Sequence, residues 1–353
     1  MSENGKKVTI QDIADSLGIS RNTVSKAINN SEGLADATRE KILQRAVEMG
    51  YKQFSYVSTL NQINLSGNSA AAPIIEGGGE IALLSSALLS NSHFASLFLD
   101  KFHQECAQLG FTLTMHRITP ENLQNRELPL TFDTSKIKGI MCIELFDYAY
   151  SQMICSLGLP VLFVDGPVRK NGEPLNADIL LMNNYTEILR FVNLMTERGL
   201  TRIGFIGDPN HCQSFMERYN AFRLAMFNHD LPVDPRFLLT CADKDLPWIA
   251  EKLKSMEDYP DVFICANDFV AIEAMQMLAK KDRSLLQKVR FLGFDDSHES
   301  RIFYPTLSTI HIHTQVMAFS ALHLLMSRIK EPAMDYRTLY AATDLILRES
   351  TEF

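Results

Sequence analysis

The sequence lacks the segments that would carry a chain into or across a membrane. No stretch approaches the roughly 20 apolar residues that a membrane-spanning helix needs. Lys6 and Lys7 are followed by no apolar run, so no secretory signal is visible. These absences favour a cytoplasmic protein. The 353 residues, 46% hydrophobic and 22% charged, are typical of a soluble globular chain and suffice for two or three compact units.

Cysteine is sparse and follows no metal-binding or disulfide pattern. The six cysteines include no C-x-x-C pair, and most lie in apolar stretches: Cys106, Cys142, Cys155, Cys212, Cys241 and Cys265. Buried reduced thiols are therefore favoured over a disulfide framework or a zinc site. His311 and His313 fall on one face of an expected strand, but no acidic or cysteine partner is evident. We predict no metal and no cofactor.

Sequence patterns of common catalytic sites are also missing. The first expected strand is followed by residues 85–92, which contain no glycine and so no phosphate-binding loop. Neither G-x-S-x-G nor H-E-x-x-H occurs. Asp295 and Asp296 are adjacent, so on an extended chain they would point to opposite sides and make a poor acid–base pair. These observations argue against an enzyme.

The net charge of -8 excludes a generally basic nucleic-acid-binding chain. Residues 1–60 nevertheless carry eight basic and seven acidic side chains, so this part is +1 and the rest is -9. Affinity for DNA would have to come from a local cationic face on an acidic body.

Residues 8–50 predict three short helices. The first begins at Thr9, a good N-cap with Asp12 three residues on, and ends at Gly18. Ser20 can cap the second helix, and the third starts near Asp36. The residues expected on the inner faces are Ile10, Ile13, Ala14, Leu17, Val24, Ala27, Ile28, Ile42, Ala46 and Met49.

The second of these helices has the pattern of a DNA-reading helix, with an apolar inner face and a polar outer stripe. Its N-terminal part would place Arg21, Asn22 and Lys26 on base edges, since Arg and Lys suit guanine and Asn suits adenine. The small polar residues that could bond phosphates are Thr9, Ser20, Thr23, Ser25 and Asn29. The alternative is a solvated polar face on an ordinary three-helix bundle.

From residue 80 the chain alternates between apolar strand-like runs and helical runs. Residues 81–86, 137–144 and 202–208 are examples of the former, and residues 94–110 and 184–199 of the latter. This alternation predicts βαβ units and mostly parallel sheet, and about 270 residues suggest two similar lobes. Asn, Ser, Ala and Gly dominate residues 52–79, which reads as a flexible linker.

Residues 8–51 resemble the headpiece of the lac repressor (LacI/GalR) family over its whole length. The matching motifs are V-T-I-x-D-I-A, G-I-S-x-x-T-V-S-K-x-I-N and T-R-x-K-I before G-Y. Further matches occur in order through the body, among them residues 159–165, 202–207, 293–295, 305–310 and 347–351. In this family the base-contacting positions fall on Arg21, Asn22 and Lys26.

The resemblance implies a small all-α helix-turn-helix headpiece and an α/β periplasmic-binding-protein-like body of two doubly wound parallel-sheet lobes. We expect the headpiece at residues 1–52, a hinge or linker at 53–79, and an effector-binding and dimerisation domain at 80–353. Lobe one would comprise about 80–181 and 312–340, and lobe two about 182–311 and 341–353.

The segment after the headpiece departs from the family pattern. Family members carry a hinge helix there that wedges a leucine into the minor groove. Leu60 keeps that position, but Gln53, Phe54 and Val57 replace the usual Pro, Asn and Ala. One hypothesis is a hinge helix with altered readout, and the other is flexibly tethered headpieces without such a helix. We favour the second.

Ligands of doubly wound sheets bind outside the carboxyl ends of the strands. The resemblance and this rule place the effector contacts on His93, Phe94, Asp165, Arg218, Asn267, Asp268 and Asp295. Arginine and carboxylates with an aromatic wall suit a hydroxyl-rich sugar or a polar ring. The alternative makes Asp268 and Asp295 helix caps and Arg218 a surface ion-pair partner. Trp248 fits either a stacking platform for a sugar or ordinary packing.

We therefore predict a homodimeric regulator, a repressor or an activator with the repressor favoured, that binds operator DNA and responds to a small molecule, for which a carbohydrate is favoured. A regulator of the same fold controlled by a protein partner, or one without a working effector site, is the alternative. A solute-binding protein would share the two lobes but would lack residues 1–50.

Overall fold

The computed structural model describes residues 9–28, 38, 41–42, 45–46, 49, 78–87, 93–169, 171–240 and 246–352. The chain forms two compact units, residues 1–76 and 77–353, and each is described by itself. Asn29, Leu60, the start of the third headpiece helix and nearly all of the 53–79 linker lie outside the described residues. The two hinge hypotheses therefore stay predictions.

The headpiece begins with α1 (Ile10–Leu17), which starts at the expected residue. Thr9 Oγ1 accepts a hydrogen bond from Asp12 N at 3.3 Å, and Asp12 Oδ2 accepts one from Thr9 N at 2.7 Å. Gly18 ends the helix in the left-handed conformation, with φ of 65°. These contacts confirm the predicted capping box and the glycine stop.

The second helix, α2 (Arg21–Ile28), is capped by Ser20 Oγ, which accepts a hydrogen bond from Thr23 N at 3.1 Å. The small apolar core of the headpiece consists of Ile13, Ala14, Val24, Ala27, Ile42 and Ala46, each at most 2% exposed. Burial of the apolar faces is what fixes these short helices, because isolated helices of eight residues are unstable in water.

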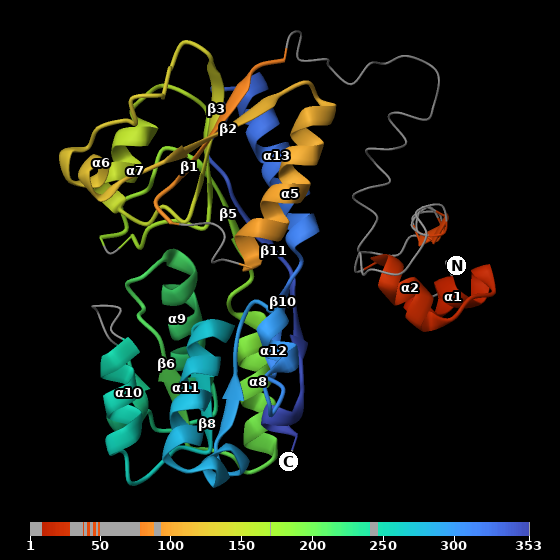
Figure 1. Ribbon diagram of the computed structural model, residues 1–353, viewed down its shortest axis with the longest axis vertical. Coiled ribbons are helices and arrows are strands. Elements are labelled where there is room, and N and C mark those ends of the chain that lie inside the picture. The colour runs from red at the N-terminus through yellow and green to blue at the C-terminus, as the bar shows by residue number, and fades with distance from the viewer. Residues whose placement is uncertain are drawn as a thin grey trace. The chain divides into compact units, whose positions relative to one another are not determined.

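Lobe one of the body is built on a parallel sheet with the order β11-β5-β4-β3-β1-β2. Its strands are β1 (Glu80–Ser85), β2 (Thr112–Arg117), β3 (Ile137–Ile143), β4 (Val161–Val164), β5 (Asp178–Met182) and β11 (Thr338–Ala341). One face is covered by α5 (His93–Gln108) and α13 (Thr314–Lys330), the other by α6 (Pro120–Asn125) and α7 (Tyr148–Cys155), as Figure 1 shows. Helices on both faces explain the nearly continuous apolar strands.

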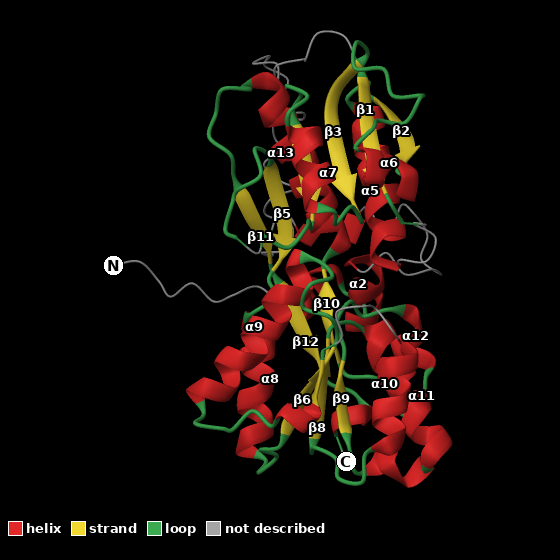
Figure 2. Ribbon diagram, turned by 90° about the vertical axis from the view of Figure 1, so that its left-hand side faces the viewer, coloured by secondary structure: helices red, strands yellow, loops and turns green. Residues whose placement is uncertain are grey.

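Lobe two has a parallel sheet with the order β7-β6-β8-β9 and an antiparallel pair, β10 with β12. The strands are β6 (Ile203–Ile206), β7 (Leu238–Leu239), β8 (Val262–Cys265), β9 (Arg290–Leu292), β10 (Thr309–Ile312) and β12 (Thr343–Ile346). The helices are α8 (Thr186–Glu197), α9 (Gln213–Asn228), α10 (Leu246–Ser255), α11 (Asp268–Lys281) and α12 (His298–Ile302). Figure 2 shows α8 and α9 on one side of the sheet and α10 and α11 on the other.

The prediction of βαβ units with mostly parallel sheet is confirmed in both lobes. Trp248, in α10, packs against the apolar core between α10, α11 and the sheet, and Lys252 lies over its ring. This is the packing alternative given for Trp248. Within the described residues, no helix is both long and apolar enough to cross a membrane.

The described chain passes between the lobes at three places: residues 183–185, residue 313 and residue 342. The first and third crossings lie together, since Asn183 N donates to Ala341 O at 2.7 Å and Thr343 Oγ1 donates to Asn183 O at 3.0 Å. These crossings make the lobe junction the part of the body where a rotation of one lobe against the other would be concentrated.

A buried ion-pair cluster ties the edge of the lobe-one sheet together. Asp178, the first residue of β5, is fully buried and lies 3.0 Å from both Nε and Nη2 of Arg328 in α13. It also accepts hydrogen bonds from the backbone N–H and the guanidinium of Arg337. Although burial alone would raise it, these hydrogen bonds hold the pKa of Asp178 below its ordinary value. One carboxylate thus joins β5, α13 and the segment before β11.

Candidate functional site

The outer surface of α2 carries the side chains that the sequence assigned to DNA. Val24 and Ala27 are buried, whereas Arg21, Asn22 and Lys26 are exposed. Within the part of the chain that is described, these three make no hydrogen bond or ion pair. Their donors are therefore available to a ligand on that face.

The small polar residues around α2 have a second role inside the headpiece. Thr9 caps α1, and the hydroxyls of Ser20 and Thr23 are 2.7 Å apart. Thr9 and Ser20 are exposed, while Thr23 and Ser25 are half-buried. Contact of these residues with phosphates stays a prediction.

In the body, acidic residues follow the carboxyl ends of strands from both lobes. Glu144 follows β3, Asp165 follows β4, and Asp295 comes shortly after β9, with φ of 52°, 60° and 115° respectively. Positive φ is unfavourable for residues other than glycine, and such strain concentrates at functional sites. Glu144 and Asp165 of lobe one are close enough to Asp295 of lobe two to interact with its carboxyl group electrostatically, so the three acidic groups lie near one another at the lobe junction.

Arg218 in α9 places a cation at the junction, and it is only 3% exposed. Its Nε donates to Asn184 Oδ1 at 2.9 Å, and its Nη1 donates to Ala266 O at 2.6 Å. The guanidinium stacks on Phe294 at 3.5 Å, and Nη1 lies 3.9 Å from the Asp295 carboxylate. The surface ion pair considered as an alternative for Arg218 is wrong, because the side chain is buried.

Asp165 binds the first turn of α9 across the junction. Its Oδ1 accepts a hydrogen bond from Ser214 N at 3.1 Å, and the neighbouring Gly166 O accepts one from Gln213 N at 2.8 Å. A carboxylate at a helix N-terminus is favoured by the unpaired N–H groups and the helix dipole. The structure therefore brings Asp165, Arg218 and Asp295 together, as the sequence predicted for residues at strand ends.

The acidic groups of the junction shift one another's protonation. Burial raises the pKa of Asp295 to about 8; Arg218 opposes this shift, and Asp268, Glu144 and Asp165 add to it. Burial also raises the pKa of Asp165. At neutral pH Asp295 is therefore mostly protonated and can donate a hydrogen bond as well as accept one.

Replacing Asp295 with Asn is expected to flatten the pH dependence of stability. The native state holds a proton on Asp295 that the unfolded chain releases near pH 4. The contribution of protonated Asp295 to the free energy of unfolding is therefore complete below about pH 4, and it is lost as the pH rises through about 8. Thermal unfolding of both proteins between pH 4 and 8 checks this, with Asp208→Asn as the matched control. An unchanged slope in Asp295→Asn would contradict the assignment.

Asn267 and Asp268 are committed to contacts inside lobe two. Asn267 Oδ1 caps α11 by accepting from Val270 N at 2.9 Å. Asp268 is 1% exposed, and its two oxygens accept from Thr309 Oγ1 at 2.6 Å and Ser297 N at 2.7 Å. Gly293 must be glycine here, because a Cβ would lie 2.0 Å from Asp268 Oδ1. Asn267 is therefore the cap of α11, whereas the carboxylate of Asp268, the first residue of that helix, is held by Thr309 and Ser297 and is not a helix cap. Contact of either residue with an effector stays a prediction.

Aromatic side chains contribute to both sides of the junction. Phe94, in the first turn of α5, stacks on Phe98 with ring centroids 5.7 Å apart. The side chain of His93 lies outside what the structure describes. Sequence reasoning missed Phe146 of lobe one, whose ring meets His211 of lobe two edge-on at 5.0 Å. It also missed Glu144. This residue directly follows an apolar strand, which is the same signal that identified Asp165.

The expectation that His311 and His313 lack acidic partners is wrong. His311 Nδ1 lies 2.9 Å from Asp296 Oδ2, and His313 Nε2 lies 3.1 Å from Asp344 Oδ2. These partners come from other segments, which sequence spacing does not reveal. Burial would raise the pKa of Asp296, but hydrogen bonds from His311 and two arginines lower it to about 2. The Asp296 carboxylate is thus fully engaged by His311, Arg301 and Arg348. The described residues contain no metal-binding cluster.

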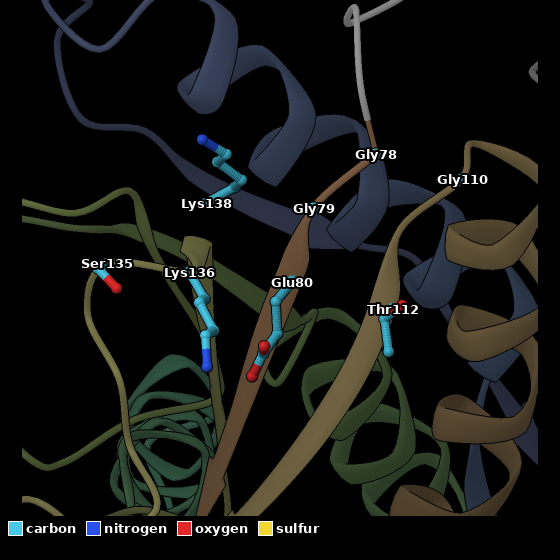
Figure 3. A pocket seen from close by; sticks show the side chains of 8 residues that line it. All are labelled: Gly78, Gly79, Glu80, Gly110, Thr112, Ser135, Lys136 and Lys138. Atoms are coloured by element: carbon cyan, nitrogen blue, oxygen red, sulfur yellow. The ribbon is translucent and has the colours of Figure 1, made fainter.

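A hollow of about 520 Å³ lies at the amino ends of the lobe-one strands, at the edge opposite the junction. Figure 3 shows it lined by Gly78, Gly79, Glu80, Gly110, Thr112, Ser135, Lys136 and Lys138. The side chains of Lys136 and Lys138 point in different directions. None of the predicted site residues lines this open hollow.

Comparison with known proteins identifies both parts of the chain. Residues 9–53 match the family model for bacterial regulatory proteins of the lacI family, and residues 192–351 match that of a periplasmic binding protein-like domain. The transcriptional repressor PurR of Haemophilus influenzae is 25% identical over 98% of each chain.

Solved structures share the fold over the full length. A transcriptional regulator CelR in complex with cellobiose has a TM-score of 0.66 at 21% identity, covering 98% of this chain and 100% of that one. The lac repressor dimer bound to operator and the anti-inducer ONPF has a TM-score of 0.62 at 18% identity, covering 98% and 99%. With its helix-turn-helix headpiece and two-lobed body, the protein is a DNA-binding transcription regulator of the LacI/GalR family.

Proposed function

We propose that the protein is a repressor that binds a pseudo-palindromic operator as a homodimer and is switched by an uncharged, hydroxyl-bearing molecule at the lobe junction. The observation that carries the proposal is the pairing of a headpiece presenting Arg21, Asn22 and Lys26 with a body whose acidic strand ends converge on Arg218. Such a regulator acts in the cytoplasm, with its DNA, and performs no catalysis.

The chemistry of the junction favours an uncharged effector over an anionic one. Arg218 already donates through Nε to Asn184 and through Nη1 to Ala266 O, and the acidic groups of Asp165 and Asp295 lie near it. Glu144 adds a further acidic group close to Asp295. A phosphate would face these acids with few free donors. Sugar hydroxyls both donate and accept, and so suit the carboxyl groups of Asp165 and Asp295, of which protonated Asp295 can itself donate. The relative solved with cellobiose supports the same class.

Homodimerisation is supported by exposed apolar side chains on lobe one. Leu97 of α5 is 49% exposed and Met115 of the edge strand β2 is 64% exposed. A solved relative of the same fold is the lac repressor dimer on its operator. Two identical headpieces would read two half-sites related by the symmetry of the protein. We assign the predicted contacts of Thr9, Ser20, Thr23, Ser25 and Asn29 to the DNA backbone.

Thermal stability against a panel of ligands tests the effector assignment. Cellobiose, xylose, ribose, glucose 6-phosphate and hypoxanthine are suitable probes. A ligand at about 100 times its dissociation constant stabilises by about 2.7 kcal/mol. The proposal expects stabilisation by an uncharged sugar. Stabilisation by the sugar phosphate alone would contradict the preference for an uncharged effector. If no ligand of the panel stabilises the protein, control by a protein partner would be favoured.

Alanine at Arg21 or at Lys26 is expected to relax base preference at one position in each half-site. The loss should be about 1–3 kcal/mol against the preferred base, because each side chain supplies one set of base-edge hydrogen bonds. Selection of binding sites from random DNA by each variant measures it. Lys41→Ala, another exposed lysine of the headpiece, is the matched control. If the base preference is unchanged in both α2 variants, Arg21 and Lys26 do not contact base edges.

A further inference from the structure

Glu217 is a buried carboxylate at the lobe junction for which the proposed function gives no role. It lies in α9, one residue before Arg218, and is 4% exposed. Its Oε1 accepts hydrogen bonds from Tyr340 OH at 3.0 Å and Gln213 Nε2 at 3.1 Å, and its Oε2 accepts one from Asn184 Nδ2 at 2.8 Å. All three donors are uncharged, which is unusual because buried carboxylates are commonly paired with a cation.

These donors come from different parts of the body. Tyr340 belongs to β11 of lobe one and lies two residues before the third chain crossing. Asn184 lies in the first crossing and is 1% exposed. Glu217 belongs to lobe two, so its carboxylate joins one lobe to the other at the crossings about which the lobes would rotate.

The hydrogen bonds continue from Glu217 to the effector side of the junction. The amide of Asn184 donates to Glu217 and accepts from Arg218 Nε, and Arg218 donates in turn to Ala266 O after β8. A continuous series of contacts therefore runs from Tyr340 through Glu217, Asn184 and Arg218 to the strand ends of lobe two. Because an amide has one accepting and one donating end, Asn184 can serve both neighbours only in this orientation.

We propose that Glu217 is a positioning residue that couples Arg218 to the lobe crossings, so that the state of the effector site and the rotation of the lobes change together. The proposal rests on the effector site assigned above. Rotation of lobe one would break the hydrogen bond from Tyr340, and the freed carboxylate would then pull on Asn184 and release Arg218. In the opposite direction, a ligand that holds Arg218 in place holds Glu217 and keeps the crossings closed.

Burial and the nearby Glu217 carboxylate raise the pKa of Tyr340 to about 12. The phenol is therefore protonated throughout the physiological range and always able to donate. Tyr340 is also 48% exposed, so removal of its hydroxyl leaves no cavity in the core. Tyr340→Phe is for these reasons a mild variant that removes only the lobe-one end of the series.

Amide hydrogen exchange of the full chain, measured by mass spectrometry without any effector, tests the coupling. Tyr340→Phe should raise exchange in the crossing segments 183–185 and 341–343 by about ten- to hundredfold, the effect of losing a hydrogen bond to a charged group. Exchange of β6 and β8 should stay unchanged. Tyr336→Phe, another exposed tyrosine near β11, is the matched control and should behave as the parent protein.

Glu217→Gln, alone and combined with Tyr340→Phe, shows whether the two residues act through one contact. If they do, the double variant exchanges at the crossings no faster than the faster single variant. Additive effects would overturn the proposal. A uniform rise in exchange across lobe two, or no rise at the crossings in Tyr340→Phe, would also overturn it, since the contact would then be ordinary packing.

These results are independent of the proposed function, because no ligand is present in the exchange experiment. If no ligand of the panel stabilises the protein but Tyr340→Phe still raises amide exchange at the crossings, the coupling through Glu217 stands and the effector assignment fails. A sugar that binds and slows exchange of the crossings in the parent protein, but not in Glu217→Gln, would be the full expected result. Equal slowing in both proteins would show that the ligand does not act through Glu217.

Discussion

Replacement of Arg218 by alanine should abolish the response to the effector while leaving binding to the operator intact. The variant removes the cation that Asn184, Ala266 and Asp295 surround. It also leaves two buried acceptors without a donor, which should destabilise the body by about 3 kcal/mol. Thermal unfolding measures the loss of stability, and operator binding with and without the identified sugar measures the response.

Arg218→Lys keeps this prediction testable if the alanine variant folds poorly. Lysine keeps the charge, but its single ammonium cannot reach both acceptors in the fork geometry of a guanidinium. We therefore expect a folded protein with a strongly weakened response. Arg223→Ala, an exposed arginine of the same helix, is the control and should respond normally. A normal response in both Arg218 variants would show that the effector site lies elsewhere.

Replacement of Asp178 by alanine should have the largest effect on stability of any single change considered. It would leave the guanidinium groups of Arg328 and Arg337 without their carboxylate, and Arg328 is only 2% exposed. Loss of one partner from a buried ion pair costs about 3–5 kcal/mol. Chemical denaturation of the full chain measures this loss.

Two controls separate the buried cluster from simple loss of charge. Asp258→Ala removes the partner of Arg202 in an exposed pair and should have little effect. Asp178→Asn keeps the size of the side chain and some acceptors, so its effect should fall between the two. Equal stability of Asp178→Ala and the parent protein would contradict the role given to this cluster.

The fold was readable from the sequence because its signals are local. Alternating apolar strands and amphipathic helices indicate parallel sheets, and Thr9, Asp12 and Gly18 mark the ends of the first helix. These patterns depend on residues three or four apart. The same logic placed Asp165 and Asp295 at one edge of their sheets, since the carboxyl ends of parallel strands lie together.

The contacts that tune the junction could not be read in this way. Glu217 and Tyr340 are 123 residues apart, and Asp178 and Arg328 are 150 apart. Spacing in the sequence contains no information on such pairs. His311 shows the same limit, because its partner Asp296 reaches it only through the return of the chain into β10. Arg218 was rightly placed at the junction, but its burial against Phe294 depends on tertiary packing.

Selection of binding sites from random double-stranded DNA by the full chain tests the central claim most directly. We predict enrichment of a pseudo-palindrome whose half-sites are related by two-fold symmetry and whose base preferences weaken at defined positions in Arg21→Ala and Lys26→Ala. Recovery of DNA without any shared sequence, in amounts that depend only on salt, would contradict a sequence-specific regulator.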